Sequence, residues 1–139
     1  MKIRFALFTL ALFIVEAISA SAQLPPEALK GLWHAHWITS ATAPQRNAAI
    51  LHFRKLFDLS QAPEHFIEHV SAENRFQLSL NQHEVVSGPA LGDLAHWKYE
   101  TYDLAPLLHS GRNELAATVW NFGALTPVAQ ISDRTGFLL

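Results

Sequence analysis

The stretch "HFIEHVSAENRFQLSLN", residues 65–81, decides the fold class. In its second half apolar residues take every other position, with Phe76, Leu78 and Leu80 alternating with Arg75, Gln77, Ser79 and Asn81. Successive side chains of a strand point to opposite faces, so this pattern predicts a β-strand with one buried and one solvated face. The letters "NQH" and "EVV" that follow predict a hairpin.

The segments on either side also read as strands. In "ILHFRKLFDL", residues 50–59, apolar side chains share one face, and Lys55 interrupts that face, which predicts a bulge or an edge position. In "ELAATVWNF", residues 114–122, both alternating sets are largely apolar. This favours a central strand covered on both faces, with Trp120 in the core. Short strands separated by turn residues indicate an all-β sandwich or barrel.

The N-terminus has the pattern of an export signal. Lys2 and Arg4 precede the apolar run "FALFTLALFIV", and "ASA" at 20–22 supplies a cleavage site. We therefore predict a signal peptide over 1–22, a linker with at most a short helical turn over 23–32, and one domain over 33–139. The protein is expected to be secreted or periplasmic and to make no membrane contact after cleavage.

Charge and cysteine content exclude several classes of protein. The net charge of −2 becomes −3 once Lys2, Arg4 and Glu16, which sum to +1, are removed. A nucleic-acid-binding protein needs a basic surface, so we expect no nucleic-acid partner. The chain has no cysteine, which rules out disulfides, zinc–thiolate sites and thiol nucleophiles.

Metal and catalytic chemistry find little support. His34 and His36 share one face of a strand, but no third ligand is evident, so we predict surface or core histidines, no metal and no cofactor. Glycoside hydrolysis needs two opposed carboxylates. The available acids stand in no recognisable motif, and we assign no catalytic residue among them: Glu68, Glu73, Glu84, Asp93, Glu100 and Asp103.

The stretch "GPALGDLAHWKYETYDLAP", residues 88–106, begins as a loop and is rich in planar, hydrogen-bonding side chains. Aromatic rings can hold the C–H faces of a sugar while polar groups pair with its hydroxyls. The candidate carbohydrate-binding residues are Asp93, His96, Trp97, Tyr99 and Asn74. An alternative stays open, in which these aromatic rings cap one end of the sandwich.

Several segments in this order carry a resemblance: "HFRKLFDL", "VSAENRFQLSLN", "HWKYETYDLAP", "GRNELAATVWNFG" and "AQISDRTGFLL". Together they resemble the N-terminal β-sandwich domain of bacterial α-L-rhamnosidase-like glycoside hydrolases. The resemblance covers about residues 33–139. It implies a galactose-binding-like jelly roll, and an enzyme whose catalytic acids lie in a separate (α/α)6 barrel. No position of this chain matches those acids.

Two features depart from the family pattern. "RTGFLL" normally leads into further sequence, so we expect a sandwich that lacks its last strand or strands. The family hairpin is Asn-Gly, whereas here Gln82 follows Asn81, which predicts a looser or longer turn because only glycine accepts a positive φ without cost.

Three hypotheses for function follow. The first is a non-catalytic N-terminal domain or fragment of a secreted rhamnosidase-like hydrolase, which supports the remaining enzyme domains and contacts a rhamnose-containing glycan. The second is an autonomous carbohydrate-binding module. The third is a structural interaction protein that uses an open sheet edge.

Overall fold

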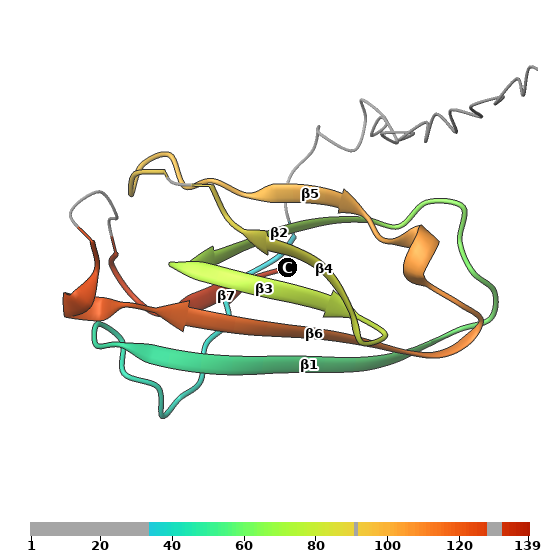
Figure 1. The fold of residues 1–139 in the computed structure, drawn as a ribbon, viewed down its shortest axis with the longest axis horizontal. Coiled ribbons are helices and arrows are strands. Elements are labelled where there is room, and N and C mark those ends of the chain that lie inside the picture. Colours follow the sequence, from blue (N-terminus) through green and yellow to red (C-terminus); the bar gives the residue numbers. More distant parts are fainter. Residues whose placement is uncertain (1–33, 91, 128–131) are drawn as a thin grey trace, which may run out of the picture.

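The protein folds into two antiparallel β-sheets that pack as a sandwich (Figure 1). The structure is a computed structural model and describes residues 34–90, 92–127 and 132–139. The predicted signal peptide and linker lie outside these ranges. The strands are β1 (Ala49–Leu59), β2 (Ile67–Glu73), β3 (Arg75–Leu80), β4 (His83–Gly88), β5 (Glu100–Asp103), β6 (Gly111–Asn121) and β7 (Gly136–Leu138).

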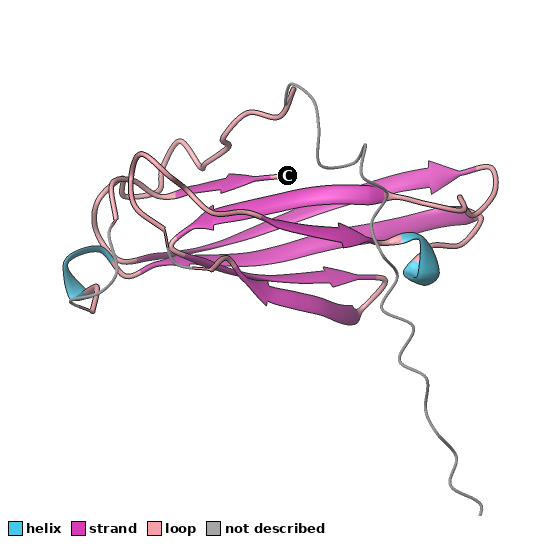
Figure 2. Ribbon diagram, turned by 90° about the horizontal axis from the view of Figure 1, so that it is seen from above, coloured by secondary structure: helices cyan, strands magenta, loops and turns pink. Residues whose placement is uncertain are grey.

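The four-stranded sheet has the order β1-β6-β3-β4, and the three-stranded sheet has the order β5-β2-β7. Two short 3₁₀ helices, η2 (Ala105–Leu107) and η3 (Gly123–Leu125), lie at opposite ends of the strands (Figure 2). The sequence-based prediction of an all-β fold with two packed sheets is confirmed. Within the described ranges, no helix is long and apolar enough to cross a membrane.

The core lies between the sheets, and the alternation seen in the sequence supplies it. Phe76, Leu78 and Leu80 of β3 are fully buried, while Gln77 between them is exposed. Strand β6 contributes three further buried residues: Leu115, Ala117 and Val119. The predicted two-faced strand over 75–80 is therefore confirmed.

The stretch 65–81 contains a change of sheet that its pattern does not reveal. Strand β2 belongs to the three-stranded sheet, and β3 begins two residues later in the four-stranded sheet. Asn74 lies between them, and its backbone N–H donates to the carbonyl of Trp120 at 2.9 Å. The crossing places Glu73 at one end of the sandwich, next to the last residues of the chain.

Strand β6 is central in its sheet, but only one of its faces is fully buried. Trp120 lies on the other face, half-buried and paired directly with Arg75 of β3. The prediction that both faces are covered, with Trp120 in the core, is therefore wrong. No second layer covers that face within the described part of the chain, and its small residues, Ala116 and Thr118, are tolerated beside water.

Strand β1 is an edge strand, as one of the two alternatives for Lys55 predicted. It pairs with β6 in unbroken register from Ala49 to Leu59, so there is no bulge between them. Lys55 is exposed on this edge. A charged side chain on an edge strand discourages pairing with another chain.

The β3–β4 hairpin is tight rather than loose, which corrects the expectation for "NQH". Leu80 pairs directly with His83, and the two residues between them both have positive φ, 51° at Asn81 and 68° at Gln82. This is the geometry that a two-residue hairpin favours. Asn81 tolerates it because its side chain is held on both sides: Nδ2 donates to the Leu107 carbonyl at 2.8 Å and Oδ1 accepts the Glu114 N–H at 2.9 Å.

Candidate functional site

One end of the sandwich contains a pocket of ≈ 430 Å³, which we call the tryptophan pocket. Its walls come from four separate parts of the chain. The lining residues are Trp37, Ile38, Thr39, Gln45, Glu73, Leu94, Trp97, Asp133, Arg134, Thr135 and Gly136. Sites for small molecules usually occupy about 300–1,000 Å³, so the pocket is large enough for a small ligand.

Backbone hydrogen bonds hold the pocket walls together. Ile38 and Phe137 exchange two of them, at 2.8 and 2.9 Å, which fixes residues 37–39 beside β7. The Thr135 N–H donates to the Gln45 carbonyl at 2.8 Å, and its hydroxyl donates to the Pro44 carbonyl at 2.9 Å. The segments are therefore positioned by contacts between residues far apart in the sequence, partly with β7 and partly between loops.

Two indole rings form the aromatic wall. Trp37 and Trp97 meet edge to face, with ring centroids 6.2 Å apart and planes at 79°. A Cβ on Gly136 would come within 3.0 Å of the Trp37 ring, so glycine is needed there for the ring to lie close to β7. Trp37 remains 48% exposed and presents much of its surface to solvent.

Trp97 carries an unsatisfied polar atom. Its Nε1–H is buried and has no acceptor among the residues that the structure describes. A buried donor without a partner costs about 1–3 kcal/mol. Such groups are uncommon in folded proteins, and they occur at sites where a ligand or water completes the arrangement.

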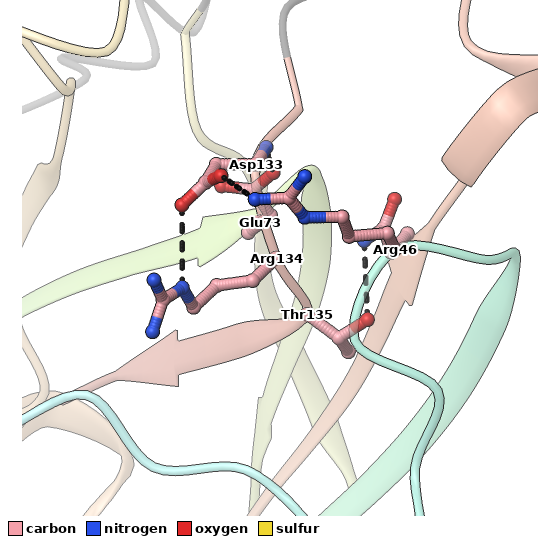
Figure 3. Close-up of polar contacts among 6 residues, drawn as sticks. Arg46, Glu73, Asp133, Arg134 and Thr135 are labelled. Atoms are coloured by element: carbon pink, nitrogen blue, oxygen red, sulfur yellow. Dashed lines mark hydrogen bonds and ion pairs between the residues drawn. The ribbon is translucent and has the colours of Figure 1, made fainter.

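Charged side chains also line the pocket or lie next to it, and Figure 3 shows their contacts. The Asp133 carboxylate forms ion pairs with Arg46 Nη2 at 3.4 Å and with Arg134 Nε at 3.2 Å, and both arginines are largely exposed. Glu73 is only 5% exposed, and its carboxylate accepts the backbone N–H of Asp133. Glu73 makes no ion pair with any residue in the described ranges.

The structure separates the five predicted carbohydrate-binding residues. Trp97 lines the tryptophan pocket, and Leu94 of the same loop joins it. Asp93 instead organises the loop: its carboxylate accepts the N–H groups of Ala95 and His96, both at 2.8 Å, and lies 3.0 Å from His96 Nδ1. The hydrogen bond to the His96 ring, followed by those to the two backbone N–H groups, lowers the pKa of Asp93.

Tyr99 and Asn74 lie outside the pocket lining. Tyr99 packs edge to face on His69 of β2, with ring centroids 5.6 Å apart. Asn74 is buried, and its Oδ1 accepts the Phe122 N–H at 3.0 Å. Of the five residues, only Trp97 therefore reaches this pocket.

Sequence reasoning missed Trp37, Asp133 and Arg134, and considered Glu73 only as one acid among six. Trp37 directly follows His36 in the sequence, but nothing there joins it to residues almost a hundred positions later. No linear spacing links the four segments, because the sandwich brings them together only after β2 and β7 pair.

A second pocket of ≈ 400 Å³ lies beside β4 and contains Trp120, Arg75 and Glu100. Its charged groups already have structural partners. Arg75 Nη1 donates to the Pro89 carbonyl at 2.5 Å, and Glu100 Oε1 accepts the Ala90 N–H at 2.9 Å. These bonds fix the chain where it leaves β4, which makes the tryptophan pocket the better candidate for ligand binding.

No group of three or more His, Asp or Glu side chains in the described ranges is arranged to hold a metal ion. His34 and His36 both lie in an exposed or half-exposed segment before Ile38.

No family model matches the chain, and no curated protein matches it. Among solved structures, the fold is similar to part of the crystal structure of a GH78 family rhamnosidase of Bacillus sp. GL1, with a TM-score of 0.68 and 27% sequence identity. The match covers 76% of this chain and 11% of that one. The resemblance to a rhamnosidase domain is thus confirmed, and this chain corresponds to a small part of such an enzyme.

Proposed function

We propose that the protein is a non-catalytic accessory domain of an exported rhamnosidase-like glycoside hydrolase. Its topology is then the galactose-binding-like jelly roll of the N-terminal region of such enzymes. In this role it packs against the remaining domains of the enzyme and contacts a rhamnose-containing glycan. The observation that carries the proposal is the extent of the match, which covers most of this chain and only 11% of the rhamnosidase. A region of that size is a domain of the enzyme and not the whole of it.

The supporting role is tested by a domain exchange. Residues 34–139 would replace the matching segment of the Bacillus rhamnosidase, and the chimera would be compared with a deletion of that segment and with the intact enzyme. We expect the deletion to lower soluble yield and melting temperature, and the chimera to restore at least part of both. A chimera no better than the deletion would count against the packing role.

The absence of catalysis is tested on the chain without its predicted signal peptide, residues 23–139, which we call the exported chain. We expect no release of nitrophenol from an aryl α-L-rhamnoside above the buffer rate. The intact Bacillus rhamnosidase is the positive control. Turnover by this chain that survives repurification would overturn the proposal.

Glycan contact is the second part of the proposal, and the tryptophan pocket supports it. Two indole rings and a buried carboxylate line it, and these are groups that recognise a sugar ring and its hydroxyls. If the chain binds glycan without any enzyme domain attached, it is an autonomous carbohydrate-binding module. Titration of the exported chain with rhamnosylated oligosaccharides distinguishes that alternative from a role in packing alone.

A further inference from the structure

We infer that the tryptophan pocket selects a neutral sugar unit over an acidic one, with Trp37 as the stacking surface and Glu73 as the hydroxyl acceptor. This inference rests on the proposed function, because it assumes that the pocket contacts glycan. It adds the chemical class of the ligand and assigns roles to two residues outside the stretch 88–106.

The shape of the site suits a ring that stacks on one side. Trp37 is the more open of the two indoles and is held against β7 by the close approach of Gly136. Contacts with Gly136 and with the Trp97 ring restrict the motion of this indole, which lowers the entropic cost of binding. The apolar C–H face of a sugar can cover this ring, while Leu94 adds a second apolar contact on the wall.

Glu73 supplies the strongest acceptor. Its carboxylate is almost completely buried, yet the bond from the Asp133 N–H uses only part of its capacity, since an ionised carboxylate has about four acceptor positions. A sugar hydroxyl that donates to it would form a charge-assisted hydrogen bond in a site of low dielectric constant.

The distribution of charge decides between neutral and acidic ligands. Asp133 contacts both nearby guanidinium groups, those of Arg46 and Arg134. Of the charged side chains that line the pocket, two are acidic, Glu73 and Asp133, and one is basic, Arg134. Glu73 has no counter-ion among the described residues, and it is the most deeply buried charge of the site. A carboxylate on the ligand would meet this negative charge at short range, which is unfavourable where water is excluded.

The test uses matched sugars that differ only at C6. The exported chain would be titrated with D-galactose against D-galacturonate and with D-glucose against D-glucuronate, with L-rhamnose as a third neutral sugar. Binding would be followed by tryptophan fluorescence and by chemical shifts of the indole N–H groups. We expect D-galactose and D-glucose each to bind at least about tenfold more tightly than the corresponding uronate.

Three variants assign the contacts. Trp37→Ala and Glu73→Gln should each weaken binding of the neutral sugars about tenfold, from loss of stacking and of the charged acceptor respectively. Glu73→Gln should also narrow the gap between galactose and galacturonate. Trp120→Ala is the matched control, because it removes an indole from the second pocket, and it should leave affinity within about twofold. Circular dichroism and melting temperature check that every variant is folded.

The outcomes separate this inference from the proposal on which it rests. Equal or tighter binding of the uronates by the unmodified chain would overturn the neutral preference but leave glycan contact standing. Binding that depends on Trp120 and not on Trp37 would move the site to the second pocket and overturn the assignment. If no sugar perturbs either signal, both the inference and the glycan part of the proposed function fail, whereas the domain exchange still tests packing against the enzyme.

Discussion

The two ends of the sandwich differ in one buried polar group, because the unsatisfied side-chain atom of the described residues lies at only one of them. At the end beside η2, Asn113 is fully buried and all of its side-chain atoms are used: Nδ2 donates to the His109 and Gly111 carbonyls at 2.8 and 3.0 Å, and Oδ1 accepts Asn81 Nδ2 at 2.9 Å. At the other end, in the tryptophan pocket, the Trp97 indole N–H has no acceptor within the described ranges, and Glu73 has no counter-ion there.

The difference is local to Trp97, because the buried Asn121 and Thr135 at the same end are satisfied by each other and by the Pro44 carbonyl. A satisfied buried network stabilises one conformation, because breaking any bond strands a partner in a medium of low dielectric constant. Polar groups left without partners cost stability and are usually found where function requires them. Four substitutions test this contrast and the local interactions of the fold, and they are taken from the largest expected effect to the smallest.

Asn113→Ala should lower the free energy of unfolding by about 2–3 kcal/mol, since it removes the amide donor to the His109 carbonyl and one of the two acceptors of the Asn81 amide. Urea denaturation followed by tryptophan fluorescence measures the loss. Gln77→Ala, which truncates an exposed amide on β3, should change it by no more than about 0.5 kcal/mol. Equal effects of the two substitutions would remove the distinction between the ends.

Gln82→Gly should raise the free energy of unfolding by about 1 kcal/mol. Gln82 has a φ of 68°, which costs a residue with a Cβ about 1–2 kcal/mol, and the greater entropy of glycine in the unfolded chain returns part of that gain. The same denaturation curves measure it. A decrease in stability would show that the Gln82 side chain makes a contribution larger than the strain.

Trp97→Phe should change stability by less than about 1 kcal/mol, although it removes a buried polar atom just as Asn113→Ala does. The smaller ring loses apolar contact, but the unpartnered N–H disappears with it, and the two terms nearly offset each other. Thermal and urea unfolding both measure the change. A loss as large as that of Asn113→Ala would mean that the indole N–H already has a partner in solution.

The smallest effect is expected at the His65–Asp103 pair, where His65 Nδ1 lies 2.7 Å from Asp103 Oδ2. The hydrogen bond to Asp103 raises the pKa of His65 above its ordinary 6.5. Burial acts to raise the pKa of Asp103, but hydrogen bonds from His65, Phe66 N–H and Ala105 N–H together outweigh it and lower this pKa below 3.8. Both shifts stabilise the pair in its charged form.

The sign of each shift sets the pH window. The contribution of His65 is fully present below pH 6.5 and is lost as pH rises through its raised pKa, while that of Asp103 is present above pH 3.8 and is lost as pH falls through its lowered pKa. His65→Gln should therefore lower the melting temperature most between these values and least in alkaline solution. His83→Gln, which removes an exposed histidine with no ion pair in the described ranges, should show no such window. A gap in melting temperature that is independent of pH would contradict the pairing.

The sequence predicted much of the fold but little of the candidate site. Alternation over 75–80 identified β3 and its buried face, because the two-residue period of a strand is a local property. The same reasoning failed for Trp120, since apolar residues on both faces of β6 do not reveal whether a second layer covers the outer face. It also failed at Gln82, where long-range bonds to Asn81 hold a tight turn that the residue type alone disfavours.

What the sequence alone determined about this protein is its strands, their inward faces and its resemblance to a domain of rhamnosidases. These follow from side chains a few positions apart, or from the order of short segments. The tertiary structure alone decided the tryptophan pocket, which joins Trp37, Glu73, Trp97 and Asp133. The physical reason is that its walls meet only when β7 pairs with β2, and no local pattern encodes a contact between residues so far apart along the chain.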